Sequence, residues 1–171
     1  MRVRVVVLSA ALAAAAGRAS AQLALDGIRW QAGRVEHGRV AAWQDVKVVA
    51  EAPPKLNDRL RVHLFLKNRG AHAVEGVLIR FSMTARVLPG GAAAAGTWAI
   101  PFAVDEKRVP FVAPGKTVEV VLDSSPALDL YLRRLARAGW WPDRLKMQVM
   151  LEPHAGSASL QTAEDVVEFS R

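Results

Sequence analysis

Residues 59–70 read RLRVHLFLKNRG, and this stretch decides the fold. Apolar side chains stand at every second position of it, as a strand with one buried face requires. They are Leu60, Val62, Leu64 and Leu66. The side chains between them, His63 included, are expected to face outward. Asn68 and Gly70 tolerate left-handed backbone angles, so a turn is predicted after the strand.

The same alternation recurs along the chain. It marks residues 77–87, 98–104, 118–122, 144–152 and 163–169, and more weakly residues 23–30 and 46–51. Pro101 cannot donate a hydrogen bond to a neighbouring strand, which places the 98–104 run at a sheet edge. The pair Asp105 and Glu106 is interpreted as a charged turn. Seven or eight short strands at this spacing predict an all-β sandwich of antiparallel sheets.

One segment has helical rather than strand periodicity. Leucines recur at helical spacing between residues 126 and 138. Ser125 is a favoured N-cap, Pro126 suits the first helical position, and Gly139 suits the end of a helix. The sequence therefore predicts one short amphipathic helix inserted between two strands, capping one end of the sandwich.

The first 21 residues, MRVRVVVLSAALAAAAGRASA, have the order of a secretory signal peptide. Arg2 and Arg4 precede an apolar stretch, and small residues end the segment, so cleavage is expected between Ala21 and Gln22. The apolar stretch is shorter than the roughly 20 residues that a spanning helix needs, so no stable membrane anchor is expected. Residues 22–171 then form a single domain, exported to the periplasm or secreted by a bacterium.

The composition narrows the classes of partner. The chain has no cysteine, which excludes disulfides, thiolate chemistry and lipid attachment at a cysteine. The net charge of +7 falls to +4 once the three arginines of the signal peptide are removed. The remaining charges are dispersed, whereas a nucleic-acid binder would show a dense basic stripe, so no nucleic acid is expected. Weak contact with anionic envelope polymers stays an alternative.

Three stretches together resemble a known class of module. They are LRVHLFLKNRG (60–70), VEGVLIRF (74–81) and VAPGKTVEVVL (112–122). Their order is similar to that of the bacterial immunoglobulin-like modules of the CARDB-like and FxLYD-like types. The resemblance implies an immunoglobulin-like antiparallel β-sandwich in which Asn68 and Gly70 shape a turn and Pro114-Gly115 leads into a strand. It implies an adhesion, scaffold or accessory role and no catalytic residues. The helix and residues 22–54 are additions to the minimal pattern.

The sequence contains only weak matches to motifs for catalysis, phosphate binding or metal binding. Gly115-Lys116-Thr117 lacks the preceding glycine of a phosphate-binding loop and is followed by a strand pattern, so a turn is predicted. His63 and His72 could approach each other beside Glu75, but their spacing is not that of a metal site. No catalytic residue, cofactor or metal is therefore predicted.

The most distinctive local feature is Trp140-Trp141-Pro142, which follows a helix carrying Arg133, Arg134 and Arg137. The structural interpretation, which we favour, has one indole closing the core and the other shielding a sheet edge. The functional alternative is a contact surface for a ligand or partner. The sequence thus predicts an exported, non-catalytic module that binds another envelope protein or has a structural role. The alternatives are a binder of envelope polymer or carbohydrate, and an enzyme or its accessory subunit.

Overall fold

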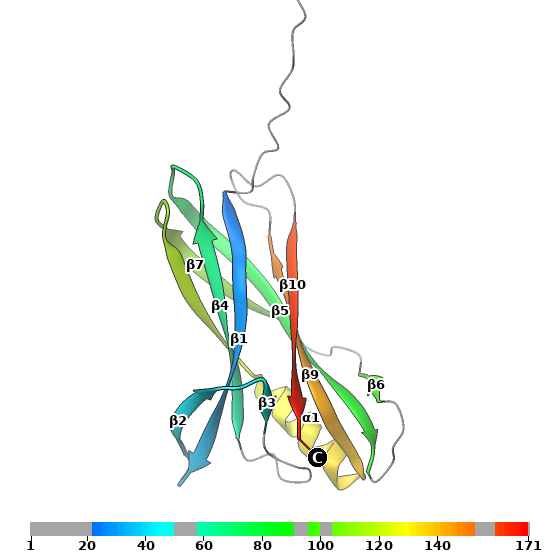
Figure 1. Ribbon diagram of the computed structural model, residues 1–171. Coiled ribbons are helices and arrows are strands. Elements are labelled where there is room, and N and C mark those ends of the chain that lie inside the picture. Colours follow the sequence, from blue (N-terminus) through cyan, green and yellow to red (C-terminus); the bar gives the residue numbers. More distant parts are fainter. Residues whose placement is uncertain (1–21, 50–57, 91–95, 100–103, 153–159, 171) are drawn as a thin grey trace, which may run out of the picture.

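Figure 1 shows the protein as a computed structural model, an elongated sandwich with its helix at one end. The structure describes residues 22–49, 58–90, 96–99, 104–152 and 160–170, and these contain ten strands and one helix. The strands are β1 (Leu23–Glu36), β2 (Arg39–Asp45), β3 (Val48–Val49), β4 (Arg59–Asn68), β5 (Val74–Pro89), β6 (Thr97–Trp98), β7 (Asp105–Val112), β8 (Thr117–Asp123), β9 (Trp140–Leu151) and β10 (Gln161–Phe169). The helix α1 spans Pro126–Arg137.

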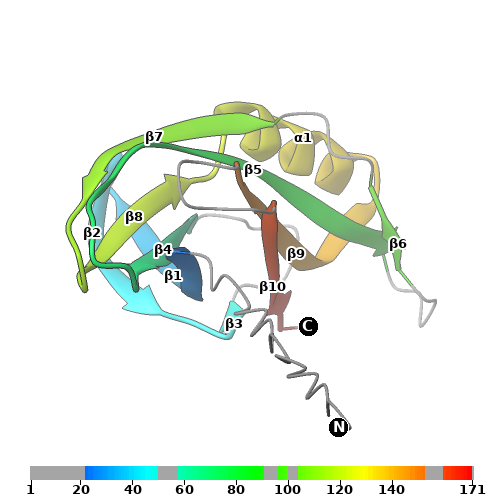
Figure 2. The same ribbon diagram turned by 90° about the horizontal axis from the view of Figure 1, so that it is seen from above.

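The strands form two sheets that face each other, as the view from above shows (Figure 2). The first has four strands in the order β2-β1-β4-β8 and is called sheet A. The second, sheet B, runs β3-β10-β9-β5-β6, and β7 also pairs with β5. All pairs are antiparallel except that of β3 with β10. The predicted all-β sandwich is confirmed, with eight strands of seven residues or more and two of only two residues.

One apolar core joins the two sheets. Val62, Leu64 and Leu66 of β4 are fully buried, as their alternation predicts. Ile79 of β5 and Met147 of β9 are equally buried and belong to the same cluster. Each sheet therefore buries one face against the other, which is the arrangement that period-2 alternation requires.

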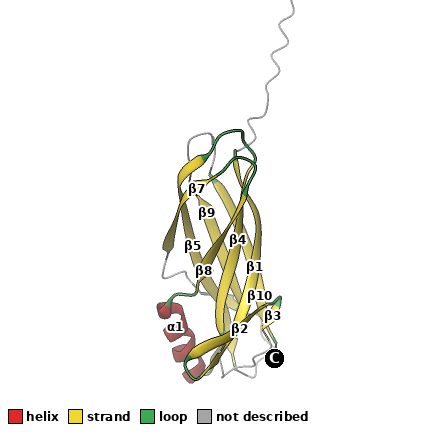
Figure 3. Cartoon of the chain, turned by 90° about the vertical axis from the view of Figure 1, so that its left-hand side faces the viewer, coloured by secondary structure: helices red, strands yellow, loops and turns green. Residues whose placement is uncertain are grey.

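Helix α1 lies at one end of the sandwich, beside β9, where Figure 3 shows it in red. The predicted bounds and caps are close to those observed. The hydroxyl of Ser125 accepts a hydrogen bond from the Leu128 N–H at 3.2 Å, and Gly139 follows the last turn with φ of +80°. Leu128 and Leu132 are buried, so the helix closes this end of the core.

Several boundaries differ from the sequence predictions. Asp105 and Glu106 do not form a turn; they begin β7. β7 shows no clear alternation because it is an edge strand whose first side chains face solvent. β6 spans Thr97–Trp98 and so shares only Trp98 with the predicted 98–104 strand, and Pro101 lies outside the described residues. The β1–β2 hairpin was also missed, since its turn, His37-Gly38, lies in polar sequence.

The predicted signal segment, residues 1–21, lies outside the described residues, including the expected cleavage site before Gln22. Within the described ranges, no helix has the length and apolar character needed to cross a membrane.

Candidate functional site

The solvent-facing side of α1 gathers the arginines that the sequence singles out. Arg133, Arg134 and Arg137 are all exposed, and Leu130 on the same side is 47% exposed. The Nε of Arg133 donates to the main-chain oxygen of Asp129 at 3.2 Å. None of the three arginines forms an ion pair within the described part of the chain. Their charges are therefore available to a partner.

Trp140 and Trp141 do not lie as we expected. Neither indole is part of the buried core: Trp140 is 42% exposed and Trp141 is half-buried. A register shift between Arg86 and Val87 of the neighbouring β5 puts Pro142 at the buried position instead. Trp140 begins β9 directly after the helix cap. We therefore define the α1 surface as Leu130, Arg133, Arg134, Arg137 and Trp140.

Two hollows border the α1 surface. The first, of about 270 Å³, lies against Leu128 and Leu132 of α1 and has Phe169 of β10 in its lining. The second, of about 240 Å³, is lined in part by Trp43 and Asp123. Arg59, Arg133 and Asp129 line both hollows, and a second aspartate completes each lining, Asp58 in the first and Asp123 in the second. With two arginines and two aspartates each, neither hollow prefers one sign of ligand.

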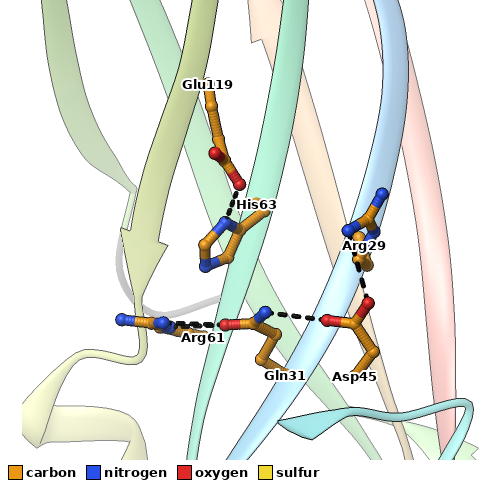
Figure 4. Close-up of polar contacts among 6 residues, drawn as sticks. All are labelled: Arg29, Gln31, Asp45, Arg61, His63 and Glu119. Atoms are coloured by element: carbon orange, nitrogen blue, oxygen red, sulfur yellow. Dashed lines mark hydrogen bonds and ion pairs between the residues drawn. The ribbon is translucent and has the colours of Figure 1, made fainter. Parts of the chain in front are cut away.

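A network of polar side chains crosses the outer face of sheet A (Figure 4). Asp45 of β2 forms an ion pair with Arg29 at 3.3 Å and accepts a hydrogen bond from Gln31 at 2.7 Å. The Gln31 carbonyl oxygen in turn accepts two hydrogen bonds from Arg61, at 2.9 and 2.8 Å. The network thus ties three neighbouring strands together on their exposed side.

Two aromatic rings lie over glycines on the same face. Trp43 faces Gly33 in the register of β1 and β2, and Phe65 faces Gly27 in that of β1 and β4. Arg61 covers the Trp43 ring at 3.9 Å from its centroid, and Arg29 lies 5.1 Å from the Phe65 centroid. Because an arginine covers each ring, this face offers no free aromatic platform for a sugar. Sequence analysis missed this arrangement, although glycines within a strand pattern are its signal.

His63 lies on the outward face of β4 but is only 8% exposed. Its Nδ1 contacts the carboxylate of Glu119 on β8, and its buried Nε2 has no hydrogen-bond partner among the described residues (Figure 4). Its neighbours in the sheet register are Arg29 of β1 and Val121 of β8. His63 does not join His72 and Glu75: no group of three potential metal ligands occurs in the described part of the chain.

The outer face of sheet B is held by ion pairs. The guanidinium of Arg86 meets Asp143 at 2.5 Å, and that hydrogen bond raises the pKa of Arg86. A hydrogen bond to Glu106 likewise raises the pKa of Arg80, with the charge of Glu152 acting in the same direction. Both guanidinium groups are already charged at neutral pH, and a raised pKa only keeps them so. The shifts therefore indicate structural ion pairs and not acid–base chemistry.

Comparisons with known proteins were made for the whole chain. No protein-family model matches it, and neither does any curated protein sequence. A β-glucosidase structure from Erythrobacter marinus is similar with a TM-score of 0.35 and 19% identity over 84% of this chain and 15% of that one. A sporulation control protein from Bacillus subtilis is similar with a TM-score of 0.35 and 9% identity over 84% of this chain and half of that one.

Proposed function

We propose that the protein is an exported, non-catalytic β-sandwich module that binds another protein of the bacterial cell envelope through the α1 surface. The observation that carries the proposal is a set of three exposed arginines that form no ion pair with any described residue, followed along the chain by an exposed tryptophan. Arginine and tryptophan are the residue types that dominate binding energy at protein interfaces. The unpaired positive charge favours a partner with an acidic surface. Export is supported by the signal-peptide order of the first 21 residues.

A second candidate function uses the same residues. The 42% exposure of Trp140 leaves part of an indole face free to stack on a sugar ring, and the arginines suit carboxylate or phosphate groups. The α1 surface would then hold an anionic envelope polymer rather than a protein. The two functions predict different crosslinks from Leu130 in the living cell, because the first predicts a crosslink to a protein and the second does not.

The test places a photo-crosslinking amino acid at Leu130 of the full-length protein in its bacterial host. We expect a protein adduct that is absent when the crosslinker stands at Val166, an exposed position on the outer face of sheet B. The adduct should also disappear when Arg133, Arg134 and Arg137 are all changed to glutamine. The matched control changes Arg34, Arg39 and Arg108, which are exposed and carry the same total charge, to glutamine.

Direct binding separates the two functions. Purified residues 22–171 would be titrated with phosphatidylglycerol vesicles and with polygalacturonate while tryptophan fluorescence is recorded. We expect no saturable response to either probe. The opposite outcome has two parts: a saturable response that the α1 triple variant loses and the control triple variant keeps, and no protein adduct at Leu130. That outcome would mean that the α1 surface binds an anionic polymer or lipid surface and not a protein.

A further inference from the structure

The free edge of β8 is a surface separate from α1. Among the described strands, β8 hydrogen-bonds only with β4. The Asn68 N–H donates to the Lys116 carbonyl at 2.9 Å, and the Ser124 N–H donates to the Leu60 carbonyl at 3.2 Å. Hydrogen-bonded pairs alternate along an antiparallel ladder, so the even-numbered residues of β8 bond to β4. The N–H and C=O groups of Thr117, Glu119, Val121 and Asp123 therefore point away from the sheet.

The outermost strands β2, β7, β3 and β6 carry features that discourage strand addition. β2 is interrupted by a register shift opposite residues 33–35 of β1, which bends the strand. β7 contains Pro110 and starts with four charged residues. β3 and β6 have only two residues each. β8 has seven residues, no proline, no glycine and no register shift, and β7 turns away from it to pair with β5 (Figure 2).

The side chains of β8 define what could pair with it. Val120 and Leu122 are buried on the core side, whereas Glu119 and Asp123 stand on the outer side. The Glu119 side chain is 49% exposed even in contact with His63. Asp123 is exposed, and no ion pair to its carboxylate occurs within the described residues. The outer side of this edge is therefore acidic.

A second copy of the chain is a poor occupant of this edge. Antiparallel pairing of two β8 strands would bring the carboxylates of Glu119 and Asp123 from both copies onto one face. Like charges that lie opposite or diagonal to each other destabilise a sheet. A strand from a different chain, with cations on its outer side, would instead pair favourably with both carboxylates.

We infer that the β8 edge accepts an extended strand of a partner protein that alternates lysine or arginine on its outer side with apolar residues on its inner side. Main-chain hydrogen bonds supply the affinity in such strand addition, and alternate side chains supply the specificity. The inference goes beyond the proposed function and does not depend on the α1 surface.

The test uses amide hydrogen exchange of ¹⁵N-labelled residues 22–171 followed by NMR. The probes are two peptides of about eight residues, a common strand length, one alternating lysine with valine and the other glutamate with valine. In the free protein, the Glu119 and Val121 amides should exchange fast and those of Val120 and Leu122 slowly. The lysine peptide should protect the first two amides and bind at least about tenfold more tightly than the glutamate peptide.

Val121→Pro removes an edge N–H that bonds nothing in β4, so it should abolish the protection while the urea midpoint changes little. Val121→Thr keeps the N–H and should bind like the unmodified protein. Asp123→Lys is the second variant, because it changes only the charge of the edge and should reduce the preference for the lysine peptide.

Three results would overturn the inference. The first is slow hydrogen exchange of the Glu119 and Val121 amides in the free protein. The second is failure of the lysine peptide to protect these two amides. The third is a dimer in sedimentation that the Val121→Pro variant does not form. The arginine triple variant of α1 should bind the lysine peptide unchanged. Failure at β8 is thereby distinguishable from failure of the proposed function.

Discussion

At Gly33, the indole of Trp43 occupies the space that any larger side chain would need. A Cβ atom there would lie 2.7 Å from the ring and 2.6 Å from a methyl group of Val40. Gly33→Ala should therefore displace the indole together with the Arg61 guanidinium that covers it. We expect the free energy of unfolding to fall by about 1–3 kcal/mol, the usual cost of overpacking, as measured by urea denaturation.

Gly27 provides the matched control. It lies on the same strand and also faces an aromatic ring, but a Cβ atom there would be 3.8 Å from Phe65, an ordinary contact. Gly27→Ala should leave stability unchanged or raise it by up to about 1 kcal/mol, since alanine restricts the unfolded chain. An equal loss in both variants would show that the Trp43 contact does not decide the effect.

The residues of the candidate site were only partly predictable from the sequence. The arginines of α1 and Trp140 could be named in advance, because a helical pattern followed by two tryptophans is a local signal. The burial of His63 could not, since it depends on neighbours on β1 and β8 that meet it only in the folded sheet. That Pro142 and not Trp141 takes the buried position likewise depends on a register shift between β5 and β9 that no local pattern marks.

At the scale of elements, α1 depends on its N-terminal cap. The Ser125 hydroxyl accepts the hydrogen bond of an N–H that has no partner within the helix. Ser125→Ala should lower the free energy of unfolding by about 1 kcal/mol, whereas Ser125→Asp should keep the cap and most of the stability. Urea denaturation followed by circular dichroism measures both. If both variants lose the same free energy of unfolding, the loss does not come from the missing cap hydrogen bond.

The elements that the sequence predicts best are those that are half-buried. β4, β5, β8 and β9 bury one face and expose the other, so their alternation is visible in the residue types. β7 is largely exposed and begins with four charged residues, so the same criterion predicts a turn at Asp105 and Glu106 and no strand after it. β2 is exposed along most of its length, and the sequence does not predict it for the same reason. Edge strands of this kind are recognised by their partners, not by their own pattern.

At the scale of the whole molecule, one apolar cluster holds sheet A, sheet B and α1 together. It includes Leu64 of β4, Met147 of β9 and Leu132 of α1. No separate apolar cluster within the described residues would let one sheet stay folded after the other has opened. The sandwich is therefore expected to unfold as one cooperative unit.

Two core substitutions in opposite sheets test this expectation. Leu64→Ala and Met147→Ala should each lower the free energy of unfolding by about 2–5 kcal/mol, because each leaves a cavity at a fully buried position. The far-UV signal of both sheets and the near-UV signal of the five tryptophans, among which Trp30 is only 2% exposed, should shift together along the urea axis. Two separated transitions, or a Met147→Ala loss confined to one signal, would mean that the sheets unfold independently. Coincident transitions in both variants would show that the proposed contact surfaces at α1 and β8 belong to one cooperative unit.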